Sequence, residues 1–302
     1  MASARANRRG TFALIGAMAV FSANDMLMKL TAQRNPLGEV IMVRGVIATL
    51  LVGSIMIGMG QITALRAATN KNVLWRTLFD GMALVLFTSA LIHMPLADLS
   101  AMNLVSPLII TALAVVLFGE EVGWRRWTAI VIGFLGTLLI VKPTPANFNA
   151  WALLGIACAF AAAIRDIITR QLSAAIPTIG ISFMAAFATV IIGGIMYFLE
   201  DWRPMAPSDV GLLAIAALLI AAGHFLIVIA FRGVDVATIA PFRYTLLIFA
   251  GVCGYLGFGE VPDRYAIFGS VLIVGSGLYA LHREVVRRRT VAGSVPPAEP
   301  GV

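Results

Sequence analysis

Charged side chains inside long apolar stretches are the first candidates for chemistry in this sequence. Asp80 and Arg243 both lie within such stretches, and Tyr244 follows the arginine. Because a charge is costly in lipid, both side chains should face the interior of a helix bundle. We expect them at similar depths from the same membrane surface, where they could pair. The two charges would bind a zwitterionic substrate, or they would form an ion pair that only holds two helices together.

Other polar and aromatic residues extend this predicted site. His224 lies near the middle of its apolar stretch, and Phe87 lies at a matching depth in an earlier one. The two could line a pocket for an aromatic group, although a single histidine is also common as a hydrogen-bonded interior residue. Asn24 and Asn103, two amides within apolar stretches, complete the predicted substrate-binding residues.

A second group of residues is predicted to gate a pathway or to pair helices. Arg44 could close on Asp25 or Glu39 near the outer surface, or these charges could simply anchor helices. A proline inside a helix removes a hydrogen bond and kinks the helix, which produces either a hinge or a packing bend. The group comprises Asp25, Arg44, His93, Arg165, Asp166, Pro107 and Pro241.

The composition predicts a membrane environment for these residues. The chain of 302 residues is 60% hydrophobic and 12% charged, with a mean hydropathy of +0.94, whereas soluble domains carry about 25% charged residues. The apolar stretches are continuous and about 20 residues long, which indicates spanning helices and not barrel strands. Ten spans are predicted, at residues 11–30, 36–59, 73–94, 97–118, 124–141, 151–171, 178–199, 208–231, 235–258 and 263–282.

The sequence also contains an internal repeat. Residues 96–141 and 234–281 each hold an apolar span, a Phe-Gly-Glu turn and a second apolar span, and Asp98 corresponds to Asp235. With five spans in each copy, the second copy must enter the membrane upside down, as in many transporters. We therefore predict an all-α integral membrane protein with ten transmembrane helices as two inverted five-helix repeats, at residues 1–145 and 146–286. Residues 287–302 are predicted to form a disordered cytoplasmic tail.

The repeat relates the candidate residues to one another. Asn24 and Asp25 correspond to Arg165 and Asp166, and the other matched pairs are Asn103 with Arg243 and Phe87 with His224. Positions where the two copies differ are where we expect substrate to bind.

The basic residues predict the orientation. Most Lys and Arg residues flank the span ends on the side of both termini, which the positive-inside rule places in the cytoplasm. We expect a multi-pass protein of the cell inner (plasma) membrane with both termini cytoplasmic. The net charge of +7 then reflects the orientation in the membrane. Nucleic-acid binding is not indicated, because no platform of aromatic residues on which bases could stack accompanies the basic residues. The expected partners are the lipid bilayer and a small-molecule substrate such as an amino acid, and a monomer is compatible with the sequence.

The chain resembles the drug/metabolite transporter superfamily, in its EamA-type branch of duplicated ten-helix proteins. The resemblance covers nearly the whole chain. It is carried by Phe21-Ser22-Ala23-Asn24 with Lys29, Pro36 with Arg44, the stretch from Ala101 to Pro107, Gly119-Glu120, Gly133 and Gly136. The second copy departs from the pattern, because Leu247 stands where the partner of Pro107 is expected and Pro241 lies nearby. Within the superfamily the chain is similar to bacterial exporters of aromatic amino acids, which implies alternating access around a central cavity.

Enzyme chemistry is not indicated. No phosphate-binding loop or H-E-x-x-H motif occurs, and the two cysteines, Cys158 and Cys253, are far apart, so no cofactor or metal is predicted. The sequence predicts a secondary transporter that exports small metabolites, above all amino acids including aromatic ones. Efflux or uptake of another metabolite, such as a drug, nucleoside or sugar derivative, is the alternative, and a membrane-embedded enzyme or scaffold is a weaker one.

Overall fold

A computed structural model describes residues 4–119, 123–142, 149–173, 175–231 and 236–293, and all regular structure in these ranges is helical. The first repeat contains α1 (Ala4–Ala32), α2 (Leu37–Gly58), α3 (Ala64–Ala68), α4 (Lys71–His93), α5 (Leu96–Asn103), α6 (Ser106–Phe118) and α7 (Trp124–Val141). The second contains α8 (Trp151–Gln171), α9 (Thr178–Met196), α10 (Pro207–Phe231), α11 (Val236–Ile239), the 3-10 helix η1 (Ala240–Tyr244), α12 (Thr245–Phe258) and α13 (Arg264–Gly293).

Ten of these segments are long and apolar enough to cross a membrane. This result confirms the ten predicted spans, with α5 and α6 forming one crossing and η1 and α12 another. The predicted tail is wrong over residues 287–293, because α13 continues through them to Gly293. Arginine is a good helix former, so the basic run prolongs the helix. Residues 294–302, Glu120 and Asp235 lie outside the described residues.

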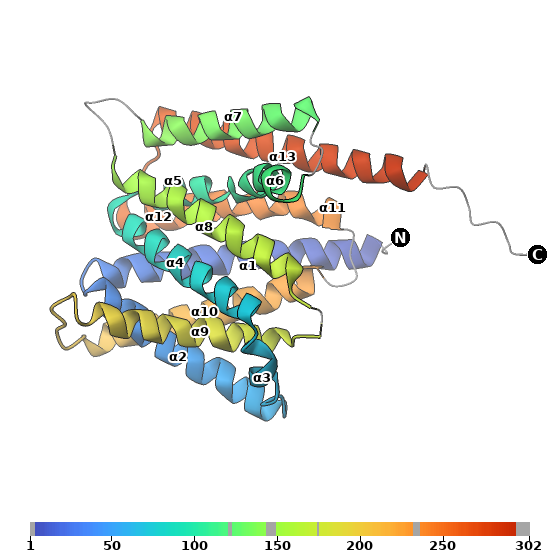
Figure 1. The fold of residues 1–302 in the computed structure, drawn as a ribbon. Helices are drawn as coiled ribbons and strands as arrows, with labels where there is room; N and C mark the ends of the chain where they lie inside the picture. The colour runs from blue at the N-terminus through green and yellow to red at the C-terminus, as the bar shows by residue number, and fades with distance from the viewer. Residues whose placement is uncertain (1–3, 120–122, 143–148, 174, 232–235, 294–302) are drawn as a thin grey trace, which may run out of the picture.

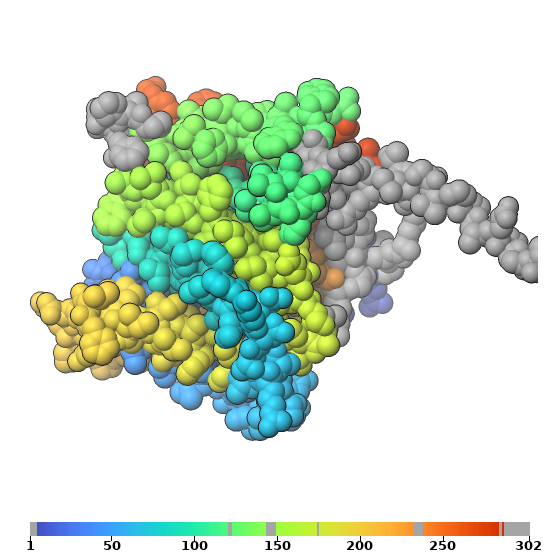
Figure 2. Space-filling view, in the orientation of Figure 1, coloured from blue at the N-terminus to red at the C-terminus, as the bar shows by residue number. Residues whose placement is uncertain are grey.

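The helices pack as an inverted duplication predicts. α2 packs on α9, and α7 packs on α13, so each of these helices meets its own repeat counterpart (Figure 1). α1 packs on α10, and α8, the counterpart of α1, packs on α4, the counterpart of α10. Figure 2 shows α8, α4 and α9 side by side on one face of the molecule.

We name the two ends of the bundle by the chain. The terminal end is where α1 begins and α13 ends, and the distal end is the opposite one (Figure 1). The distal end holds the α1–α2 turn, the α4–α5 turn, the α9–α10 connection and the α12–α13 connection.

Two crossings are broken at corresponding places. Pro107 at the start of α6 has no N–H for the carbonyl of Asn103, and the hydroxyl of Ser106 donates to that carbonyl instead, at 2.7 Å. In the second repeat Pro241 lies in η1, and the hydroxyl of Thr245 donates to the carbonyl of Phe242 at 2.7 Å. Both prolines therefore mark real interruptions. Discontinuous helices of this kind form the binding regions of many transporters.

The repeats also end their broken helices alike. Gly119 after α6 and Gly259 after α12 both adopt the left-handed conformation, with φ of +63° and +67°. Glycine adopts this conformation without the steric cost that a side chain adds. The Phe-Gly-Glu motif thus has a backbone role as a helix stop in both copies.

Small residues set the closest helix approach. A Cβ atom added at Gly136 of α7 would lie 2.6 Å from the carbonyl oxygen of Gly269 in α13, and a Cβ at Gly269 would lie 2.5 Å from the carbonyl oxygen of Gly136. Helices in membranes associate through such small-residue contacts because no water-driven hydrophobic force operates there.

We expect Gly136→Ala to push α7 away from α13 and to lower the free energy of unfolding by about 1–3 kcal/mol, the usual cost of overpacking. Thermal unfolding of purified protein in detergent measures the change. Gly251→Ala in α12 is the matched control, since a Cβ there meets nothing within 4 Å. Equal melting temperatures for the two variants would contradict this packing.

Candidate functional site

A cluster of charges lies between α4 and α8. Nη1 of Arg165 donates to Oδ1 of Asp80 at 2.9 Å, and Nε of Arg165 donates to Oδ1 of Asp166 at 2.9 Å. Nη1 of Arg76, one turn before Asp80 on α4, lies 3.6 Å from its Oδ2. We call Arg76, Asp80, Arg165 and Asp166 the α4–α8 cluster. Its side chains are between 17% and 29% exposed, so other residues cover them only in part.

A second polar group lies between α1 and α2. Nδ2 of Asn24 donates to Oδ1 of Asp25 at 2.9 Å, and Nη1 of Arg44 donates to Oδ1 of Asn24 at 3.5 Å. We call Asn24, Asp25 and Arg44 the α1–α2 cluster. Asn24 is 3% exposed and Arg44 is 8% exposed, so this cluster is more deeply buried than the first.

The two clusters are related by the internal repeat. Asn24 bonds to Asp25 in the same way that its counterpart Arg165 bonds to Asp166. The α1–α2 cluster lies about two helical turns from the distal end, and the α4–α8 cluster about two turns from the terminal end. They therefore flank the midplane.

The charges of the two clusters balance. Asp25, Asp80 and Asp166 provide three carboxylates, and Arg44, Arg76 and Arg165 provide three guanidinium groups. A balanced set of buried charges can hold a ligand that carries both a cation and an anion. A ligand with one sign of charge would leave the other sign uncompensated.

An aromatic pair borders the charges. Phe21 of α1 and His224 of α10 meet edge to face with ring centroids 5.6 Å apart. The Phe21 ring fills the space over Gly223, where a Cβ would lie 2.2 Å from it. Nδ1 of His224 lies 2.8 Å from the carbonyl oxygen of Ile220, which fixes the ring. Phe21 lies one turn before Asn24 and Asp25 on α1, so the aromatic pair lies next to the α1–α2 cluster.

Two of the sequence hypotheses need correction. Asp80 pairs with Arg165 and Arg76, and no ion pair between described residues joins it to Arg243. Arg243 is exposed in η1, because the broken helix turns it away from α4. Arg44 bonds to Asn24 and not to Glu39, whose Oε2 is buried without a hydrogen-bond partner.

The other candidates take structural positions in this conformation. Tyr244 is half-buried and its ring fills the space beside Gly277 of α13. Phe87 packs among Ala83 and Cys158 and does not form the aromatic contact of His224. His93 stacks on Trp151 at the distal end, with ring centroids 3.6 Å apart. Asn103 and the two prolines lie at the helix breaks.

Arg165 is the central member of the α4–α8 cluster, although the sequence pattern suggested only gating or helix pairing for it. The signal was present, because Arg165-Asp166 is the counterpart of Asn24-Asp25 with one amide replaced by a cation. Lys29 and Glu260 were not among the predicted site residues, but they form an ion pair between α1 and the α12–α13 connection. Among described residues, no group of three or more His, Cys, Asp or Glu side chains could hold a metal ion.

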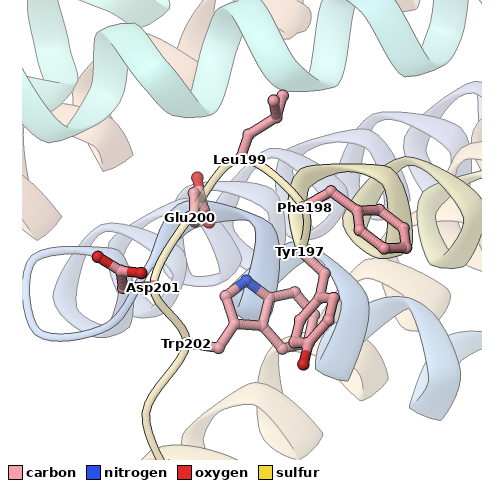
Figure 3. A pocket seen from close by; sticks show the side chains of 6 residues that line it. All are labelled: Tyr197, Phe198, Leu199, Glu200, Asp201 and Trp202. Carbon is pink, nitrogen blue, oxygen red and sulfur yellow. The ribbon is translucent and has the colours of Figure 1, made fainter.

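A surface pocket lies elsewhere, at the distal end. It is lined by residues 197–202 of the α9–α10 connection, where Trp202 packs edge to face on Tyr197 at 4.9 Å (Figure 3). Glu200 from this segment accepts a hydrogen bond from the backbone N–H of Gly38 at 2.8 Å. Aromatic residues at a span end are typical of the membrane–water interface. We assign this segment to anchoring, because it lies far along the bundle from the α4–α8 cluster.

Comparison with known proteins agrees with the fold. The model of the EamA-like transporter family matches residues 8–142 and again residues 149–281. The chain is 30% identical over 270 residues to the pseudopaline exporter CntI of Pseudomonas aeruginosa, covering 88% of this chain and 94% of that one. It is 26% identical over 263 residues to the S-adenosylmethionine uptake transporter of Rickettsia bellii, covering 87% and 90%.

Two further similarities are more distant. The riboflavin transporter of Rhizobium johnstonii is 26% identical over 219 residues, which is 72% of each chain. A solved structure described as "Crystal structure of protein" superposes with a TM-score of 0.61 at 18% identity, covering 93% of this chain and 98% of that chain. That likeness concerns the fold alone.

The duplicated helical bundle with charges at its centre defines a membrane transporter and not an enzyme. Both halves match one family model, and the chain belongs to the EamA-like transporter family. It is a transporter of a small metabolite, as its relatives are.

We expect Asp80→Asn to reduce transport at least about tenfold, because it removes a charged hydrogen-bond partner of Arg165, worth about 1.5–3 kcal/mol. Initial rates in proteoliposomes measure the loss. The protein should still fold, since Arg165 keeps Asp166. Asp201→Asn, on the exposed α9–α10 connection, is the control. Unchanged transport by Asp80→Asn would show that the cluster only holds helices together.

Proposed function

We propose that the protein is a secondary transporter that exports amino acids or metabolites with an amino-acid group, including aromatic ones. The observation that carries the proposal is the balanced pair of clusters flanking the midplane, with equal numbers of acidic and basic side chains. An α-amino acid carries an ammonium and a carboxylate on one carbon, so it satisfies both signs of charge at once.

The substrate would compete with bonds inside the protein. A substrate carboxylate can replace Asp80 on Arg165, and a substrate ammonium can then take the released carboxylate of Asp80. Because a buried ion must always be compensated, this exchange is favourable only for a ligand with both charges. The exchange would free α4 from α8, and by the repeat symmetry it would change how α1 packs on α10.

The apolar part of the substrate would lie against Phe21 and His224, next to the α1–α2 cluster. An edge-to-face aromatic pair leaves ring faces and edges that favour a further aromatic or sulfur-containing group. The name of one relative supports this substrate class, because S-adenosylmethionine contains methionine.

The proposed location is the inner membrane with both termini in the cytoplasm, on the strength of the positive-inside bias. Export follows from the resemblance to amino-acid exporters, and the export function of CntI supports it. No ATP-binding loop is present in the sequence, so we infer that a gradient of substrate or of protons drives transport.

Uptake of labelled phenylalanine, tryptophan, methionine and S-adenosylmethionine into proteoliposomes, with and without a pH gradient, tests the proposal. We expect saturable flux for at least one of these amino-acid compounds and none for labelled riboflavin. Empty liposomes and liposomes with Asp80→Asn are the controls. Absence of flux for every amino-acid compound would refute the substrate class.

Competition experiments test the need for both charges. The methyl ester of a transported amino acid lacks the carboxylate, and its N-acetyl derivative lacks the ammonium. We expect each to compete at least about tenfold more weakly than the parent, since each leaves one buried protein charge without a partner. Equal competition by either derivative would contradict recognition by the balanced clusters.

A further inference from the structure

A buried ammonium group ties three segments together at the distal end. Lys29, in the last turn of α1, is 2% exposed. Its Nζ donates to the carbonyl oxygen of Met94 at 2.6 Å and forms an ion pair with Glu260. The Nζ also lies 4.9 Å from the centroid of the Phe258 ring. One side chain thus joins α1 to the α4–α5 turn and to the α12–α13 connection.

The carboxylate of Glu260 is held in place for this pairing. Its second oxygen, Oε2, accepts a hydrogen bond from the backbone N–H of Leu96 at 2.8 Å. The backbone N–H of Glu260 donates to the carbonyl of Gly254 at 3.2 Å, after the left-handed Gly259 has turned the chain back onto α12. A Cβ on Gly254 would lie 2.8 Å from Oε2, so glycine leaves the space that the carboxylate uses.

Other contacts also cross between the repeats at the distal end, such as the hydrogen bond that Nδ2 of Asn35 donates to Oδ2 of Asp209 at 2.9 Å. A further ion pair at this end is more exposed. Lys142 at the end of α7 pairs with Asp263, whose side chain is 45% exposed. The hydrogen bond from Lys142 and the backbone N–H of Ala266 hold the pKa of the Asp263 carboxyl below its usual value. This pair therefore stays ionised through neutral pH, but exposed ion pairs contribute little to stability.

The exposure of the charges differs between the two ends. The α4–α8 cluster, nearer the terminal end, is up to 29% exposed, whereas Lys29 at the distal end is buried together with Asn24 and Arg44. The side chains of the α4–α8 cluster are therefore less buried than Lys29, Asn24 and Arg44.

We propose that Lys29 and Glu260 form the latch that closes the distal side of the transport pathway. The proposal rests on the alternating access proposed above. The latch holds α1 of the first repeat against the α12–α13 connection of the second, so the two repeats separate at the distal end only when it breaks. Once the ion pair breaks, water must hydrate both charges. The pair is therefore broken only in the conformation that is open on the distal side.

Cysteine accessibility tests the latch without any substrate. Ala97→Cys places a reporter beside Leu96, at a position that is 7% exposed, in a background with Cys158→Ala and Cys253→Ala. Labelling by a membrane-impermeant maleimide in lipid nanodiscs should be slow with the latch intact. In Lys29→Ala we expect labelling about ten- to a hundredfold faster, as the loss of hydrogen bonds to a charged group predicts.

Two further variants make the result decisive. Glu260→Gln keeps an acceptor for Leu96 but loses the charge, so it should increase labelling in the same direction by a smaller factor. It decides the question alone if Lys29→Ala does not fold. Lys142→Ala removes the exposed ion pair at the same end and should leave labelling near the starting rate.

Unchanged labelling in Lys29→Ala and Glu260→Gln would overturn the proposal, and so would an equal increase in Lys142→Ala. Faster labelling in Lys29→Ala together with absence of amino-acid flux in liposomes would leave the latch standing and refute only the substrate class. The two failures are therefore distinguishable.

Discussion

The cost of placing a charge in lipid is the constraint on which this structure depends. It favours arrangements in which an ionised side chain within the spans faces protein and finds an opposite charge or a polar group, although Arg243 is exposed in η1. Arg165 meets Asp80 and Asp166, Arg44 meets Asn24, and Lys29 meets Glu260. The pairs of Arg165 with Asp80 and of Lys29 with Glu260 join the two repeats. Asp166 is the neighbour of Arg165 in the chain, and the contact of Arg44 with Asn24 lies within the first repeat. The same constraint would select the proposed substrate, because its charges must replace those that it displaces.

The inverted duplication explains why the polar centre has two halves. Each repeat carries a polar residue followed by aspartate on its first helix, and the twofold relation places these dipeptides on opposite sides of the midplane. Each repeat also breaks a helix and bridges the break with a hydroxyl, from Ser106 in one and Thr245 in the other. Pro107 and Pro241 do not lie at equivalent positions of the repeats. The two repeats therefore share the break in the helix but not the position of the proline.

Most of the fold could be predicted from the sequence, and the pairing of side chains could not. A span is defined by its length and apolarity, and both are local properties, so ten crossings and their duplication follow without knowledge of contacts. The depth of Asp80 and Arg243 also follows from their positions in the spans. Depth does not determine which way a side chain points around the bundle. That direction decides that Asp80 forms its ion pair with Arg165. The pairing of Glu260 was likewise not predicted, because it depends on the turn at Gly259 that brings this side chain to Lys29.

The distribution of burial links these contacts to a transport cycle. Lys29 and Glu260 are 3% and 17% exposed in their side chains, against 27% for Arg165 and 24% for Asp80. The attraction within a pair that is shielded from water is less screened, although burying both charges also costs desolvation. The proposed latch is therefore the more shielded of the two groups of charges. If the substrate is the zwitterion proposed above, its two charges can replace water around the α4–α8 cluster, and α4 and α8 can then close over it. Two rigid repeats that rock about the midplane cannot be close together at both ends. Closure at the terminal end would therefore separate the repeats at the distal end.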